Sequence, residues 1–137
     1  MIDLDLDLDL VEIGTELPAL ALAPISRSTL ALFGGASGDH NPIHLDLDVA
    51  RSAGLDDVFA HGMLSMAYLG RLLTGWVPQS RIRTFGVRFV AITPVLAEPT
   101  CHGVVRSVDD GLATLDLSVR LADGTTTLTG HAVIDLR

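Results

Sequence analysis

Two acids and two histidines fall within eight residues of one another, inside residues 37–46, which read SGDHNPIHLD. Pro42 fixes its own φ and disfavours helical backbone for the residue before it, so the segment between Asp39 and His44 is a stiffened loop. A carboxylate and an imidazole held in a fixed geometry could share one water molecule, one group accepting its proton while the other delivers a proton nearby. The segment therefore predicts a general acid–base pair formed by Asp39 and His44.

A second feature is His61-Gly62-Met63, which directly precedes an apolar segment with helical spacing. A glycine in the first turn lets a ligand approach the backbone, and the free N–H groups of a helix N-terminus face that ligand with the positive end of the dipole. This suits a thioester carbonyl whose oxygen gains negative charge during a reaction. We predict an oxyanion site at Gly62, and we expect His61 to order the turn before the helix.

The same acids and histidines could serve other purposes. Asp39, His40, His44 and Asp46 offer the oxygen and nitrogen ligands that zinc or non-haem iron accepts, and His44-Leu45-Asp46 has the His-x-Asp form of some iron oxygenases. No distant third ligand is evident, so we expect no metal and no cofactor. Asp39 could also simply cap its loop, and His44 could be a satisfied structural histidine. We expect His40 on the surface and Asp46 at the start of a short helix.

Composition narrows the function classes. The chain has 137 residues, 48% hydrophobic and 19% charged, which fits one globular domain. All nine basic residues are arginine, which excludes a catalytic lysine, and the net charge of −8 disfavours nucleic acid as a partner. Cys101 is the only cysteine and is predicted to be a buried, inert thiol. The sequence contains no basic leader and no apolar run long enough for a membrane span, so we expect a cytoplasmic protein.

Helical patterns come early and strand patterns come late. Helices are predicted at residues 29–36, 49–53 and 63–74, with Ser26 and Asp46 as N-caps and Gly54 after the second helix. Strands are predicted at residues 17–24, 83–92, 100–108, 112–121 and 125–135. This order indicates an α+β domain in which a curved antiparallel sheet wraps one long buried helix, apolar on almost every side. Residues 1–10 are predicted to be an acidic tail or an edge strand, and residues 11–137 a single domain.

The combined motifs resemble those of the MaoC-like (R)-specific enoyl-CoA hydratases and 3-hydroxyacyl thioester dehydratases. The residues that carry the resemblance are Ser37-Gly38-Asp39, Asn41-Pro42-Ile43-His44 with Asp46, Gly54, and Ala60-His61-Gly62-Met63. Val87-Arg88-Phe89, followed by Thr93-Pro94-Val95, also looks like a region of this family, although the usual Gly-Asp after the Pro-Val turn is here Ala97-Glu98. The resemblance extends from about residue 11 to the end of the sequence and implies a hot-dog fold.

The resemblance also implies a reaction and site residues. The catalytic pair falls on Asp39 and His44, the carbonyl-binding N–H on Gly62, and a residue that holds the loop on Asn41. The implied reaction is syn addition of water to a trans-2-enoyl thioester of CoA or acyl carrier protein, giving the (R)-3-hydroxyacyl thioester, or its reverse. The active species would be a homodimer, or a heterodimer with another hot-dog subunit. Arg88 could contact a CoA phosphate, since a guanidinium suits phosphate, although exposed arginines on strands are usually only solvated.

Two other functions stay open at this point. A hot-dog thioesterase would use Asp39 to activate water against the thioester carbon. A non-catalytic subunit would instead complete a heterodimer and shape the acyl tunnel. The presence of both proton-transfer residues favours an enzyme over the second alternative.

Overall fold

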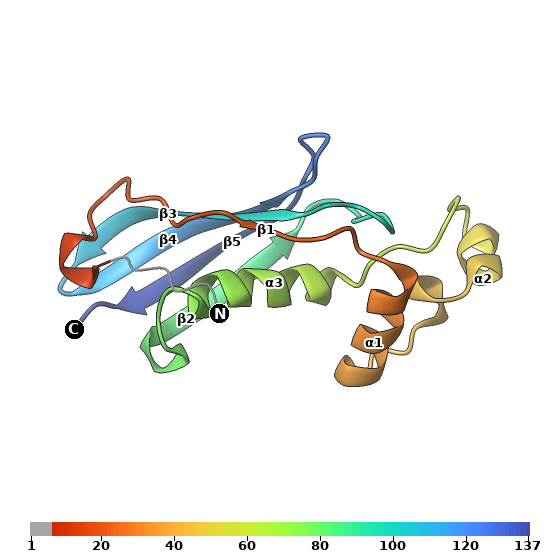
Figure 1. Cartoon of the computed structure of the whole chain (residues 1–137), viewed down its shortest axis with the longest axis horizontal. Helices are drawn as coiled ribbons and strands as arrows, with labels where there is room; N and C mark the ends of the chain where they lie inside the picture. Colours follow the sequence, from red (N-terminus) through yellow and green to blue (C-terminus); the bar gives the residue numbers. More distant parts are fainter. Residues whose placement is uncertain (1–6) are drawn as a thin grey trace.

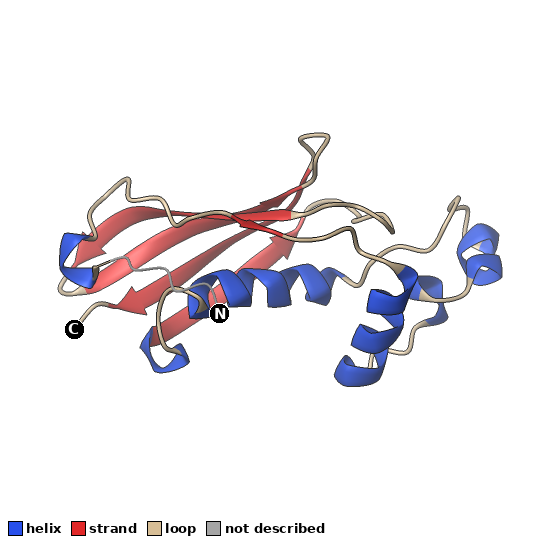
Figure 2. Ribbon diagram, in the orientation of Figure 1, coloured by secondary structure: helices blue, strands red, loops and turns tan. Residues whose placement is uncertain are grey.

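The fold is a five-stranded antiparallel sheet with one long helix, α3 (Gly62–Thr74), packed along one face (Figures 1 and 2). The computed structural model describes residues 7–137. The strands are β1 (Leu20–Ala21), β2 (Ile82–Phe89), β3 (Thr100–Asp109), β4 (Leu112–Arg120) and β5 (Thr126–Asp135), in the order β1-β3-β4-β5-β2 across the sheet. The predicted α+β class and the central helix against an antiparallel sheet are confirmed.

The two shorter α-helices lie beyond the first turn of α3, away from the sheet (Figure 1). Helix α1 (Arg27–Ser37) begins where the Ser26 hydroxyl accepts a hydrogen bond from the Thr29 N–H. Helix α2 (Leu47–Ser52) begins where the Asp46 carboxylate accepts from the N–H groups of the next turn. Both predicted N-caps are therefore confirmed. Single turns of 3-10 helix complete the element order of residues 7–137: η1 (Leu8–Leu10), η2 (Pro42–His44) and η3 (Gln79–Arg81).

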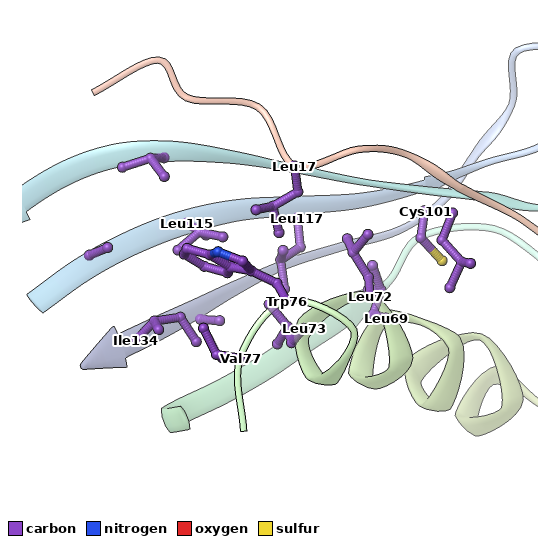
Figure 3. Packing of buried hydrophobic residues seen from close by; sticks show 14 of the residues in the cluster. Leu17, Leu69, Leu72, Leu73, Trp76, Val77, Cys101, Leu115, Leu117 and Ile134 are labelled. Atoms are coloured by element: carbon purple, nitrogen blue, oxygen red, sulfur yellow. The ribbon is translucent and has the colours of Figure 1, made fainter. Parts of the chain in front are cut away.

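The main hydrophobic core lies between α3 and the sheet (Figure 3). Leu69, Leu72 and Leu73 of the helix meet Leu115 and Leu117 of β4. Trp76, Val77, Cys101 and Ile134 extend the same cluster, which gives α3 a fixed position under the sheet. Burial raises the pKa of the Cys101 thiol to about 12, in accord with the expected inert side chain.

Two strands are shorter than the sequence patterns suggest. Strand β1 keeps only two residues of the expected 17–24. Pro18 has no N–H to donate, and beyond Ala21 the chain faces Pro99, which has none to offer in return. Strand β2 ends at Phe89, since the N–H groups of Val90 and Ala91 both turn to the Thr127 carbonyl. The sheet therefore ends beside the start of α3.

The sheet covers one face of α3 and leaves another open. Met63, Ala67 and Arg71, spaced four residues apart, are exposed, so the helix is not enclosed on every side as its composition suggests. Among residues 7–137, no helix is long and apolar enough to cross a bilayer. The expected tail or edge strand at residues 1–10 lies mostly outside the described part, in which Leu8–Leu10 form η1.

Candidate active site

The loop after α1 is held by a chain of short hydrogen bonds. Gly38 ends the helix in left-handed conformation, with φ of 77°, and the Ser37 hydroxyl then accepts from the Asp39 N–H at 3.1 Å. Oδ1 of Asp39 accepts from the Asn41 N–H at 3.2 Å, and Oδ1 of Asn41 accepts from the Ile43 N–H at 3.1 Å. The Asn41 side chain thus bonds to the backbone of its own loop, and Oδ2 of Asp39 takes no part in these hydrogen bonds.

His44 is buried and has its tautomer fixed by the backbone. Its Nδ1 lies 2.7 Å from the Phe59 carbonyl oxygen, which can only accept a hydrogen bond. Nδ1 therefore carries the proton in the neutral ring, and Nε2 keeps a free lone pair. The Phe59 ring packs edge-on against the imidazole, with the ring centroids 4.8 Å apart. This arrangement presents Nε2 as a proton acceptor of fixed orientation.

The free carboxylate oxygen of Asp39 faces that nitrogen. Oδ2 of Asp39 lies 4.0 Å from Nε2 of His44, too far for a direct hydrogen bond. A water molecule could contact both atoms at ordinary hydrogen-bond distances across this gap. The Asp39 side chain is 45% exposed and that of His44 only 9%, so the pair joins a solvent-accessible acid to a sheltered base. The structure thus brings together the two residues that the sequence singles out.

His61 belongs to the same cluster, although the sequence predicts for it the ordering of the turn before the helix. Its ring lies against that of His44, with centroids 4.0 Å apart and planes tilted by 31°. Its Nε2 lies 3.2 Å from the Asp39 carbonyl oxygen, and its Nδ1 is buried without a hydrogen-bond partner. Burial, reinforced by the neighbouring His44, lowers the pKa of His61, so this ring is neutral at physiological pH. The one sequence signal for this role is a histidine inside the apolar segment 58–64.

Gly62 opens α3 with a backbone that no side chain caps. The N–H groups of the first helical turn have no side-chain partner, and the oxyanion site at Gly62 stays a prediction. A Cβ atom on Gly62 would lie 2.8 Å from the ring of Phe89, so the absence of a side chain permits this close approach. An apolar groove of about 480 Å³ runs beside it, lined among others by Phe59, Met63 and Phe89.

Arg88 lies away from these groups. Phe89 contacts Gly62 on the helix side of the sheet, and Val87 packs against the core on that side. Because side chains alternate along a strand, Arg88 points to the opposite face of β2. The structure therefore does not bring Arg88 to the Asp39–His44 pair, and its contact with a CoA phosphate stays a prediction.

Within residues 7–137, the side chains grouped closely enough to hold a cation differ from the set considered in the sequence. The potential ligand atoms of Asp39, His44 and His61 lie within 4.8 Å of one another, whereas His40 and Asp46 are not part of this group. Asp46 instead caps α2. Nδ1 of His44 and Nε2 of His61 already contact the Phe59 and Asp39 carbonyl oxygens. If either of these nitrogens coordinated a cation, its hydrogen bond to the carbonyl would be lost.

Comparisons with known proteins agree on one family. The family model described as "MaoC like domain" matches residues 10–127. The chain is 30% identical over 129 residues to fatty acid synthase subunit beta of Saccharomyces cerevisiae, covering 91% of this chain and 6% of that much longer protein.

Solved structures agree on the fold. The (R)-hydratase from A. caviae involved in PHA biosynthesis superimposes with a TM-score of 0.84 at 26% identity, covering 93% of this chain and 98% of that one. A chain of the ChsH1-ChsH2 complex from Mycobacterium tuberculosis gives a TM-score of 0.83 at 26% identity, covering 93% and 100%. The chain therefore belongs to the MaoC-like dehydratase family and has its hot-dog fold.

Proposed function

We propose that this protein is an (R)-specific hydratase or dehydratase that interconverts trans-2-enoyl and (R)-3-hydroxyacyl thioesters. The observation that carries the proposal is the pairing of a free Nε2 on His44 with a free carboxylate oxygen on Asp39, 4.0 Å apart. The likeness to an (R)-hydratase from A. caviae supports the same reaction. The proposal treats residues 11–137 as one hot-dog domain.

In the hydration direction, Nε2 of His44 takes a proton from the water held between the two side chains. The oxygen of that water bonds to C3 of the enoyl thioester, and the C2–C3 π electrons move toward the thioester oxygen. The proton taken from water is then delivered to C2, either by the imidazolium or through Asp39. Since one water supplies both the hydroxyl and the C2 proton, addition on the same face of the double bond needs no other proton source.

The thioester oxygen becomes negatively charged in this step and needs hydrogen-bond donors. The uncapped first turn of α3 offers the Gly62 N–H and the positive end of the helix dipole. Gly62 and Phe59 both line the apolar groove, and the Phe59 carbonyl also fixes His44. Asp39 and His44 do not line this groove, but Phe59 connects it to His44, and its apolar lining suits the acyl part of a substrate.

The proposal is tested by crotonyl-CoA hydration, followed as loss of the thioester enone absorbance. Asp39→Asn and His44→Ala should each lower kcat by about two orders of magnitude or more, the usual worth of a positioned proton-transfer group. His40→Gln is the matched control, because His40 is exposed beside Asp39 and should leave kcat unchanged. Full activity in Asp39→Asn and His44→Ala, or release of free CoA thiol by the wild type, would end this assignment.

We also propose that the chain works as a dimer, with a second copy or a related hot-dog chain along β2. Strand β2 ends the described sheet, and Phe89, Val90 and Ile92 beside this edge are 51%, 49% and 53% exposed. An open edge strand next to exposed apolar side chains is a surface that proteins normally cover. Light scattering should give twice the chain mass of 14.5 kDa, and an active monomer would contradict this.

A further inference from the structure

The imidazole of His61 contacts both members of the proton-transfer pair. It stacks on the His44 ring at 4.0 Å and its Nε2 reaches the Asp39 carbonyl oxygen at 3.2 Å. Phe33 of α1 packs edge-on against the same ring, with ring centroids 4.9 Å apart. The side chain is 1% exposed, so its contacts are almost entirely with protein.

We propose that His61 is a positioning residue, whose neutral imidazole fixes the distance and orientation between Asp39 and His44. This inference rests on the proposed hydratase function. A ring nitrogen of His61 also lies within 4.8 Å of an Asp39 carboxylate oxygen and of a His44 ring nitrogen. Its hydrogen bond goes to the backbone of Asp39 and its ring face goes to His44, so it acts through both residues.

The hydrogen bond defines which nitrogen of His61 carries the proton. The Asp39 carbonyl can only accept, so Nε2 is the donor and Nδ1 is bare in the neutral ring. A proton on Nδ1 would place a charge and an unpaired donor in a buried site. His44 and Asp39 are the charged or titratable groups that influence this ring, and burial outweighs the effect of the Asp39 carboxylate. The ring therefore keeps one tautomer and one charge state while His44 gains and loses its proton.

The backbone around His61 is built for this contact. Gly34 of α1 lies under it, where an added Cβ would be 3.2 Å from the Asp39 carbonyl oxygen and 3.8 Å from Nε2 of His61. His61 is also the residue directly before Gly62, at the start of α3. One side chain thus links the Asp39 loop, the His44 ring and the first turn of the helix that offers the oxyanion site.

Three variants separate the two contacts. His61→Phe keeps a ring against His44 but removes the hydrogen bond, His61→Gln keeps a donor for the Asp39 carbonyl but removes the ring, and His61→Leu removes both. A displacement of a few tenths of an ångström should lower kcat by about tenfold in the first two variants, and by about 100-fold in the third. KM for crotonyl-CoA should change by less than about threefold, since substrate binding is unchanged.

Folding is checked separately by circular dichroism, with His40→Gln as the exposed-histidine control. A kcat for folded His61→Leu equal to that of the wild type would overturn the proposal. A loss of kcat in proportion to the fraction of unfolded protein would overturn it as well. Wild-type protein without hydratase activity would contradict the proposed function itself. In that case the protonation of the His61 ring nitrogens, measured by NMR, still tests the contacts of His61, because it needs no activity.

Long-range ¹H–¹⁵N correlation spectra of the ¹⁵N-histidine-labelled wild type report the protonation of each ring nitrogen. We expect His61 to be neutral with its proton on Nε2 between pH 7 and pH 8, with the signals assigned by their absence from His61→Phe. A proton on Nδ1 in this range, or a charged ring, would contradict the hydrogen bond and the neutral role assigned to His61.

Discussion

Two adjacent glycines in α1 allow a sharp test of the site geometry. An alanine Cβ at Gly34 would lie 3.2 Å from the Asp39 carbonyl oxygen, whereas one at Gly35 would meet nothing within 4 Å. Both glycines are helical and neither has a positive φ. Gly34→Ala and Gly35→Ala therefore make the same chemical change in the same helix, and only the first presses on the loop that carries Asp39.

The size of each effect follows from these distances. Alanine stabilises a helix interior relative to glycine by up to about 1 kcal/mol, so Gly35→Ala should raise the free energy of unfolding by roughly that amount. At Gly34 the gain is offset, because the Asp39 backbone has to move by a few tenths of an ångström. A misplacement of 1 Å can cost about 100-fold in rate, so a shift of this size should lower kcat of Gly34→Ala by about three- to tenfold.

The assays are urea unfolding and crotonyl-CoA hydration on both variants. We expect Gly35→Ala to be more stable and fully active, and Gly34→Ala to gain less stability and lose activity. Equal stabilisation and full activity in both variants would refute the claim that the contact of α1 with the Asp39 backbone sets the geometry of the site.

Other expected outcomes follow from the same structure. Gly62→Ala should lower kcat by about tenfold or more, because its Cβ would lie 2.8 Å from an aromatic ring, while Gly70→Ala, with ordinary contact at 3.8 Å, should stay active in the same assay. The Cys101 thiol should not react with a chromogenic disulfide at pH 8 until urea unfolds the protein, since burial raises its pKa to about 12. Hydrogen bonds from Arg137 hold the pKa of Asp135 well below its usual range, so its stabilising effect is present at neutral pH and is lost as the pH falls. The destabilisation caused by Asp135→Asn in urea unfolding should accordingly shrink as the pH falls below the ordinary aspartate pKa of about 4. Dialysis against a chelator should leave hydration unchanged, and a loss that zinc restores would contradict proton transfer as the role of the site.

Local signals predicted much of the fold correctly. Ser26 and Asp46 begin helices because their side chains accept hydrogen bonds from N–H groups two or three residues away. Such a contact involves only neighbouring residues, so the local sequence predicts it. Gly54 has a φ of 87°, as expected for a residue that follows a helix. The loop between Asp39 and His44 could be predicted for the same reason, because Pro42 and the Asn41 side chain act on their immediate neighbours.

Features that depend on contacts between distant parts of the chain could not be predicted from the sequence. The length of β1 depends on which backbone groups β3 offers, and the open face of α3 depends on how far the sheet extends. His61 lies 17 residues beyond His44 and 22 beyond Asp39, so its stacking and its hydrogen bond arise only when α1 and α3 meet. The ring of Phe89 reaches Gly62 for the same reason.

The central claim is that His44 and Asp39 act on a single water molecule beside the acyl double bond. Hydration of crotonyl-CoA in D₂O, with the product analysed by proton NMR and chiral chromatography, tests it most directly. The account requires (R)-3-hydroxybutyryl-CoA carrying one deuterium at C2, on the same face as the new hydroxyl. Deuterium on the opposite face, a mixture of faces, or an (S) product would contradict it.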